Sequence, residues 1–165
     1  DSLFEYMFIF SKCQPKTFNE IIENRTNIEK SVCKKDIMIR QKDGTFKKSE
    51  RINKGLVKKK GNVWTYLNNS NSTKDKIAFE HPAIFPEQLA NDHIISWSKE
   101  NDLVYDPFMG SGTTAKMSIL NNRNWIGSEI SSEYCNIIEE RVKKTLEEKR
   151  KEKDLIANSL FGNDF

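Results

Sequence analysis

The stretch "VYDPFMGSGTT", residues 104–114, decides how the second half of this chain folds. It runs from an apolar pair through Asp106 and Pro107 into a loop with two glycines and three hydroxyl side chains. Only 7 of the 165 residues are glycine, and two of them lie here. Glycine allows a sharp backbone turn and lets a ligand lie against the main chain. The stretch therefore predicts a strand, a ligand-binding turn and the start of a helix.

The sequence around the loop extends this pattern to strand–helix–strand–helix. We expect a short strand at 103–105, a helix at 111–120 opened by hydroxyl caps, a second strand at 125–129 and a long helix from 132 to about 156. The long helix should carry an apolar stripe of Tyr134, Ile137, Ile138, Val142 and Leu146. This order predicts a parallel strand pair with a right-handed crossover, and so an α/β fold with a partial Rossmann-like sheet.

Two acids flank the glycine loop and restrict its ligand. Asp106 stands at the tip of the first strand, and Glu129 ends the second strand, about twenty residues beyond the loop, where nucleotide-type sites keep a ribose-binding acid. Asp106 would repel a pyrophosphate but attract an ammonium or sulfonium group. The loop also lacks the Gly-Lys-Ser/Thr ending of a P-loop, since Lys116 is misplaced for it. S-adenosylmethionine carries both cations and a ribose and fits best; the alternative is that Asp106 only caps the helix and the glycines only turn the chain.

The residues before this pattern are less regular. "FEYMFIF", residues 4–10, predicts a buried strand. Residues 16–75 are irregular, basic and rich in Asn, with a hairpin signal at Asp43-Gly44 and a short strand expected at 62–67. Residues 81–99, "HPAIFPEQLANDHIISWSK", predict a helix with a proline in its first turn.

Composition narrows the classes of function. Net charge is +3, but residues 34–60 hold eleven Lys and Arg against three Asp and Glu, which favours an anionic partner such as nucleic acid. The three cysteines are far apart and none forms a Cys-x-x-Cys pair, so we expect no metal site, no disulfide framework and a cytoplasmic protein. No apolar run is long enough to span a membrane, and we expect no membrane partner.

The motifs resemble a known family. "DPFMGSGTT" followed by "WIGSEISSEYCNII" resembles the cofactor motifs of S-adenosylmethionine-dependent DNA amino-methyltransferases, which methylate adenine N6 or cytosine N4. "HPAIFPEQLANDHI" is similar to their other cofactor-side motif, and "FEYMFIFSKCQPKTFN" and "GNVWTY" are similar to flanking segments. The order matches the later parts of the class called beta. The resemblance therefore implies the end of a catalytic half at 1–15, a target-recognition region at 16–75 and a cofactor-binding part at 76–165.

The resemblance also implies roles for individual residues. Asp106 would hold the methionine amino group, Glu129 would bind the ribose, and Ile130 would flank the adenine. The loop residues that would line the cofactor are Phe108, Gly110, Ser111, Gly112, Thr113 and Thr114. The residues that would close the site from the other side are His81, Pro82, Ala83 and Phe85. For His81 the alternative is a structural cap, and for Phe85 it is core packing.

The family's catalytic tetrapeptide, Asp/Asn/Ser-Pro-Pro-aromatic, is not in this sequence. The prolines are Pro15, Pro82, Pro86 and Pro107, so no two are adjacent. In the family the tetrapeptide orients the target amine and stacks on the flipped base. We therefore expect no catalytic residue in this chain, which starts without Met, and an upstream catalytic half on the same or a separate polypeptide. The isolated chain should bind cofactor and DNA without transferring methyl groups.

The basic segment lies where the family keeps target recognition, and its expected partner is double-stranded DNA. Phosphate contacts there should be sensitive to salt. The candidate DNA-binding residues are Arg40, Lys42, Lys47, Lys48, Arg51, Lys58, Lys59 and Lys60. Whether adenine or cytosine is the target stays open. The alternatives are a catalytically inactive module that binds DNA or a partner, and an RNA or small-molecule methyltransferase. A sheet edge left without a neighbour would favour self-association or docking to the missing half.

Overall fold

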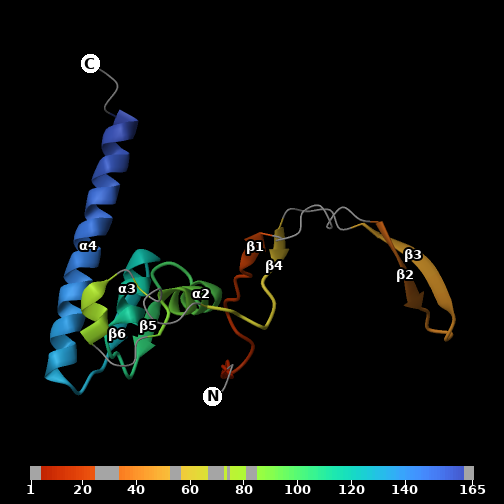
Figure 1. The fold of residues 1–165 in the computed structure, drawn as a ribbon, viewed down its shortest axis with the longest axis horizontal. Coiled ribbons are helices and arrows are strands. Elements are labelled where there is room, and N and C mark those ends of the chain that lie inside the picture. Colours follow the sequence, from red (N-terminus) through yellow and green to blue (C-terminus); the bar gives the residue numbers. More distant parts are fainter. Residues whose placement is uncertain are drawn as a thin grey trace. The chain divides into compact units, whose positions relative to one another are not determined.

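The structure of the chain is a computed structural model (Figure 1). The residues that it describes are 5–24, 34–52, 57–66, 73, 75–80 and 85–161. The chain divides into two compact units. The small unit is Glu20–Trp64, and the large unit combines Asp1–Asn19 with Thr65–Phe165. The roles assigned to 1–15, 16–75 and 76–165 stay predictions.

The large unit contains the expected strand–helix–strand–helix order. Its elements are η2 (Lys76–Glu80), α2 (Glu87–Trp97), β5 (Leu103–Asp106), α3 (Thr113–Leu120), β6 (Asn124–Gly127) and α4 (Ser132–Phe161). β5 and β6 pair in parallel, with Leu103 opposite Asn124 and Asp106 opposite Gly127. The predicted α/β fold with a parallel strand pair is confirmed. Within the described ranges, no helix is both long and apolar enough to cross a membrane.

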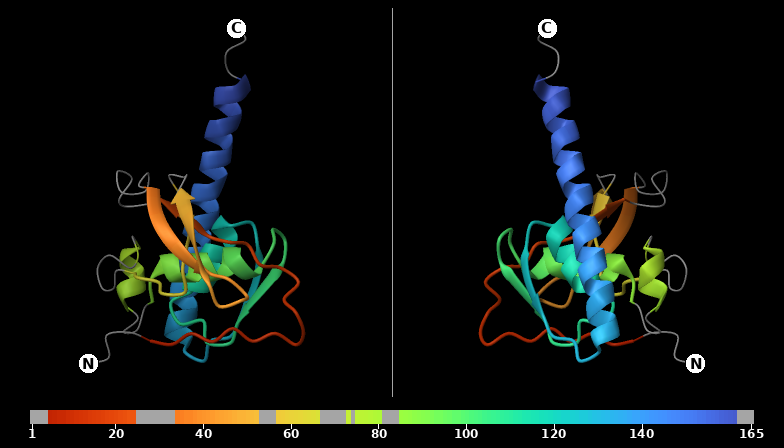
Figure 2. Two further views of the ribbon diagram at one scale, coloured as in Figure 1. Left: turned by 90° about the vertical axis from the view of Figure 1, so that its right-hand side faces the viewer. Right: turned by 90° about the vertical axis from the view of Figure 1, so that its left-hand side faces the viewer.

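Helix α3 is the centre of the large unit. It contacts α2, α4 and both strands, and the long α4 runs beside it in both views of Figure 2. One apolar cluster joins Ala90 and Ile94 of α2 to Met117 of α3. A second cluster lies on the other side of α3 and consists of Met109, Ala115 and Ile138, with Trp125 and Val142 packed against them. Small residues such as Ala115 allow this close packing around a short helix.

The expected strand at 4–10 is wrong for the residues that are described. Residues 5–10 form no strand, and the side chains of Tyr6, Phe8 and Phe10 are 77%, 73% and 88% exposed. A strand needs a neighbour for its backbone groups, and no strand of the described residues pairs with this segment. A run of aromatic residues is buried only where another part of the protein packs against it.

Four further expectations need correction. Residues 62–66 form no strand, and the indole of Trp64 donates a hydrogen bond to the Gly61 carbonyl within this segment. β6 ends at Gly127, two residues before the predicted end at 129. Leu146 is 52% exposed, so the apolar stripe of α4 does not extend to it. Pro86 precedes α2 as its N-cap instead of standing in the first turn.

The small unit is more regular than its sequence suggests. β1 (Ile22–Asn24) pairs antiparallel with β4 (Val57–Lys59), and β2 (Lys34–Arg40) pairs antiparallel with β3 (Phe46–Ile52). The predicted Asp43-Gly44 hairpin is confirmed between β2 and β3. Gly44 has a φ of 86°, and the Asp43 carboxylate accepts a hydrogen bond from the Thr45 backbone N–H at 2.9 Å. The region therefore contains two strand ladders where an irregular segment was expected.

Candidate functional site

The two acids singled out in the sequence meet at one loop. Asp106 is the last residue of β5 and Glu129 lies two residues beyond β6. Parallel strands end at the same edge of a sheet, so both acids reach the loop that follows β5. The Glu129 carboxylate accepts a hydrogen bond from the Gly110 backbone N–H at 2.8 Å. The carboxylates therefore stand at neighbouring strand ends around one glycine loop.

Two hydrogen bonds fix the Asp106 side chain, one from each end of this loop. Its Oδ1 accepts a hydrogen bond from the Phe108 backbone N–H at 3.0 Å. Its Oδ2 accepts a hydrogen bond from the Thr114 hydroxyl in the first turn of α3 at 2.6 Å. The carboxylate is half-buried. Its orientation is thus set before any ligand arrives.

The Glu129 side chain connects the loop to the start of α4. Besides Gly110, it accepts hydrogen bonds from the backbone N–H groups of Ile130 and Ser131 at 2.9 and 3.0 Å. Three backbone donors therefore converge on one carboxylate. Hydrogen bonds to a charged acceptor are roughly twice as strong as neutral ones. Glu129 consequently holds the loop and the α4 entry in a fixed relation.

The glycines of the site are required by backbone conformation and by packing. Gly110 and Gly112 have φ values of 54° and 80°, in the region that favours glycine. A Cβ at Gly112 would lie 3.2 Å from Ile138 Cγ1 of α4. A Cβ at Gly127 of β6 would lie only 1.8 Å from Met109 Cε. Backbone conformation therefore favours glycine at positions 110 and 112, and a side chain at position 127 would require Met109 to move.

The site has two exposed apolar side chains, one on the loop and one after β6, and three hydroxyl groups that form hydrogen bonds within the protein. Phe108 is 88% exposed and Ile130 is fully exposed at 103%. The Ser111 and Thr113 side chains are instead buried and accept hydrogen bonds from Arg141, while Thr114 donates to Asp106. The hydroxyls thus shape the loop from inside, and the apolar groups form its outer surface.

Of the residues predicted to close the site from the other side, Phe85 is described. Phe85 is 39% exposed. It lines an apolar groove of about 660 Å³ together with Leu89 and His93 of α2, Val104 of β5 and residues 7–10. His81, Pro82 and Ala83 lie outside the described residues. The groove adjoins β5, which among the described strands pairs with β6 alone.

A cluster of charged side chains beneath the loop was missed in the sequence. Lys116 Nζ of α3 lies 2.6 Å from Asp75 Oδ2 and 2.8 Å from Glu87 Oε1. Arg141 of α4 lies 3.3 Å from Asp75 Oδ2 and 2.9 Å from Glu87 Oε1. Two features of the sequence indicate this cluster. Lys116 is the single charged residue in the segment that forms α3, and Arg141 directly precedes Val142 of the apolar stripe on α4.

The cluster has a clear effect on ionisation. Burial by itself would raise the pKa of Asp75, whose side chain is 7% exposed. Hydrogen bonds from Lys116 and Lys144 and the charges of Lys116 and Arg141 outweigh burial and lower that pKa from 3.8 to about 2. Asp75 is therefore a carboxylate across the physiological pH range.

The predicted DNA-binding residues fall into two groups in the small unit. Arg40, Lys42, Lys47 and Lys48 are exposed at the tip of the β2–β3 hairpin, where Arg40 stands opposite the exposed Phe46. The members of the other group have partners on the protein: Lys58 with Glu23 at 2.9 Å, Lys59 with Glu20 at 2.6 Å, and Lys60 over the Trp64 ring at 4.8 Å. Arg51 belongs to β3. The hairpin tip therefore carries four exposed basic side chains.

Comparison with known proteins gives a consistent result. The family model described as DNA methylase matches residues 1–140. The chain is 54% identical over 147 residues to the orphan methyltransferase M.BamHII of Bacillus amyloliquefaciens, covering 86% of this chain and 54% of that protein. It is 39% identical over 92 residues to the type II methyltransferase M.BglII of Bacillus subtilis, covering 55% and 25%.

Solved structures are similar over shorter stretches. The M1.HpyAVI–SAM complex is 34% identical with a TM-score of 0.41, and the alignment covers 50% of this chain and 42% of that one. The chain spans about half the length of M.BamHII and a quarter of M.BglII. The family model matches residues 1–140, and the glycine loop with its two acids agrees with that match. The chain therefore belongs to the DNA methylase family of N6 and N4 methyltransferases.

Proposed function

We propose that this chain is the cofactor-binding and DNA-recognising part of a DNA methyltransferase that uses S-adenosylmethionine. The target would be the exocyclic amine of adenine (N6) or cytosine (N4). The observation that carries the proposal is the meeting of Asp106 and Glu129 at one glycine loop, with Glu129 bonded to Gly110 at 2.8 Å. Membership of the DNA methylase family supports the same reading.

The residues of the loop fit this cofactor. Asp106 would bind the ammonium group and Glu129 the ribose hydroxyls, since both are acceptors held in place by the backbone. Phe108 and Ile130 expose large apolar side chains beside these acids, and a flat adenine ring would cover them. When bound, the cofactor supplies a methyl group activated by its sulfonium. The chain's own contribution is to orient that group and to exclude water around it.

Cofactor binding is tested by calorimetric titration of the chain with S-adenosylmethionine. Asp106→Asn and Glu129→Gln should each weaken binding about tenfold or more, because a hydrogen bond to a charged group contributes roughly 1.5–3 kcal/mol. Asp102→Asn is the matched control: Asp102 directly precedes β5, at the end away from the loop, and its carboxylate accepts from the Lys99 backbone N–H. Absence of binding by the unaltered chain, or equal losses in all three variants, would contradict the proposal.

We propose that the catalytic tetrapeptide lies on a segment outside the 165 residues of this chain. Its docking surface would be the edge of β5 and the apolar groove beside it, where Leu103 is 62% exposed. An open strand edge presents backbone groups ready for another strand. The isolated chain should therefore transfer no labelled methyl group to duplex DNA, and adding the upstream segment should restore transfer. Steady turnover by the isolated chain would refute this division of labour.

DNA binding is proposed for the β2–β3 hairpin tip. The variant Lys42→Gln/Lys47→Gln should lower the salt dependence of duplex binding, because each lost phosphate contact reduces the slope of log binding constant against log salt concentration by about 0.9. The control Lys58→Gln/Lys59→Gln removes ammonium groups that are paired with Glu23 and Glu20, and should change the slope less. Equal slopes for both variants would remove the hairpin from the interface.

A further inference from the structure

We propose that Arg141 is a positioning residue that holds the glycine loop in its ligand-binding shape and ties it to Asp75 and Glu87, at the starts of η2 and α2. The role in binding rests on the proposed cofactor site. Arg141 lies on α4 and its side chain is completely buried. It bonds to the loop residues Ser111 and Thr113 from inside the protein, so any effect on a ligand must act through the loop.

One side of the Arg141 guanidinium bonds to the loop. Nη1 donates to the Ser111 carbonyl, to the Ser111 hydroxyl at 3.1 Å and to the Thr113 hydroxyl at 3.3 Å. Ser111 stands between the two glycines with positive φ, Gly110 and Gly112. Glycine has the largest conformational freedom of any residue, so this part of the loop needs an anchor to keep one shape. Arg141 supplies that anchor from inside the protein.

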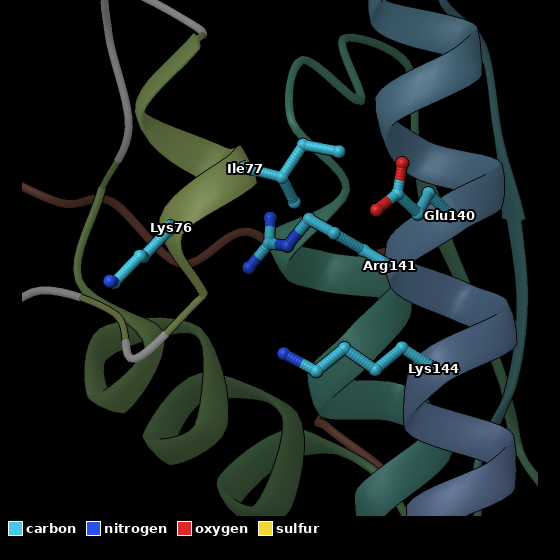
Figure 3. Close-up of a pocket in the computed structure, with 5 residues that line it drawn as sticks. All are labelled: Lys76, Ile77, Glu140, Arg141 and Lys144. Carbon is cyan, nitrogen blue, oxygen red and sulfur yellow. The ribbon is translucent and has the colours of Figure 1, made fainter.

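The other side of the guanidinium bonds to two acids far away in the sequence. Nε donates to Asp75 Oδ2 at 3.3 Å and Nη2 donates to Glu87 Oε1 at 2.9 Å. Figure 3 shows Arg141 reaching from α4 toward η2, where Lys76 and Ile77 line a pocket of about 420 Å³. The planar guanidinium presents donors in several fixed directions and so bridges the loop and the two acids, whereas the ammonium of lysine is a single point charge at the end of a flexible stem.

Asp75 and Glu87 bracket the segment predicted to form the other wall of the site. That segment, residues 81–85, lies between them, and both acids also bond to Lys116 of α3. The cluster of Asp75, Glu87, Lys116 and Arg141 therefore connects the loop to the starts of η2 and α2. A movement of the loop relative to Asp75 or Glu87 must break a buried ion pair, which is strongly unfavourable. The geometry assigns to Arg141 the task of holding the loop in a fixed position relative to these two acids.

The first test observes the loop directly, using nuclear magnetic resonance of the chain labelled with ¹⁵N-glycine. The substitution Arg141→Lys should shift or broaden the amide signals of Gly110 and Gly112. Gly44 and Gly61 of the small unit should keep theirs. Lys144→Met is the matched control, because Lys144 pairs with Asp75 at 3.1 Å from the surface of the same helix. This control should leave the Gly110 and Gly112 signals in place.

The second test titrates the same variants with S-adenosylmethionine. Arg141→Lys should raise the dissociation constant about tenfold, because charge-assisted bonds to the loop are lost. Lys144→Met should change it less than about twofold, as expected for an exposed ion pair. If the unaltered chain does not bind the cofactor, the proposed function fails, and the glycine signals still decide whether Arg141 shapes the loop.

A third variant covers the case in which Arg141→Lys lowers the helical content. Thr113→Val keeps the side-chain shape and removes one of the loop acceptors of Arg141. It should move the Gly112 signal and weaken binding in the same direction by a smaller factor. Unchanged Gly110 and Gly112 signals in both Arg141→Lys and Thr113→Val would overturn the inference.

Discussion

Acidification should weaken the large unit through Asp75. The folded-state pKa of Asp75 is about 2, below its ordinary 3.8, so folding favours the carboxylate. A lowered folded-state pKa contributes stability above the unfolded pKa, and this contribution is lost as the pH falls toward the folded value. The large unit should therefore lose this stability as the pH falls from about 4 to about 2.

The size of the effect follows from the pKa difference. Each pKa unit corresponds to about 1.4 kcal/mol, so the shift from 3.8 to about 2 contributes about 2 kcal/mol to the free energy of unfolding. The Asp75 side chain is 7% exposed, so solvent screens this contribution little. About half of it should be gone at about pH 3.

The variant Asp75→Asn isolates this contribution. It should be less stable than the unaltered chain at about pH 6 by about 3–5 kcal/mol, because Lys116 and Arg141 then share a single carboxylate, that of Glu87. The difference should shrink by about 1 kcal/mol at about pH 3, where the unaltered chain has lost part of its own contribution. Urea denaturation followed by circular dichroism measures both values.

Asp154→Asn is the control for this experiment, since Asp154 is an exposed aspartate on the same α4 helix. Its difference from the unaltered chain should stay constant over the same pH range. If the difference for Asp75→Asn is also constant between about pH 6 and about pH 3, the ion cluster does not stabilise the carboxylate as argued.

Two further predictions concern the glycines. Gly127→Ala should lower the free energy of unfolding by about 1–3 kcal/mol, because the new Cβ would lie 1.8 Å from Met109 Cε and displace a buried side chain. Gly112→Ala should cost roughly 1–2 kcal/mol, because alanine is strained at a φ of 80° and meets Ile138 at 3.2 Å. Gly61→Ala, with no atom within 4 Å of the added Cβ, should leave the thermal midpoint unchanged, and equal midpoints for all three variants would contradict both predictions.

The sequence predicts best where local signals agree with each other. The loop of residues 104–114, its hydroxyl residues and the acid after the next strand are close in sequence, and together they specify β5, α3, β6 and their parallel pairing. The Asp43-Gly44 turn specifies the β2–β3 hairpin for the same reason. Backbone conformation at a glycine or a tight turn is decided by a few neighbouring residues, so a single sequence contains the information.

The sequence predictions fail where the local structure depends on residues that are far away in the sequence. The aromatic run at 5–10 has the composition of a strand, but a strand forms only beside a neighbour. The ion cluster joins Asp75 to Lys116 and Arg141, which are 41 and 66 positions away, and no periodicity links them. Charged residues on a polar chain are ordinarily read as surface groups. Their burial follows from the tertiary fold alone.

The glycine loop itself explains why charges are buried beneath it. Its two left-handed glycines lie on either side of Ser111, whose carbonyl oxygen bonds to a completely buried guanidinium. A buried carbonyl needs a donor, so an apolar side chain at position 141 would leave it unsatisfied. The donor that meets it is a cation, and a buried cation needs acids close by. Asp75 and Glu87 meet that need, and Glu87 belongs to the segment that resembles the family's second cofactor motif, while Asp75 lies six residues before that segment. The first motif, the glycine loop, has a backbone shape that requires a buried cation. The need for acids beside that cation explains why the second motif packs against the first.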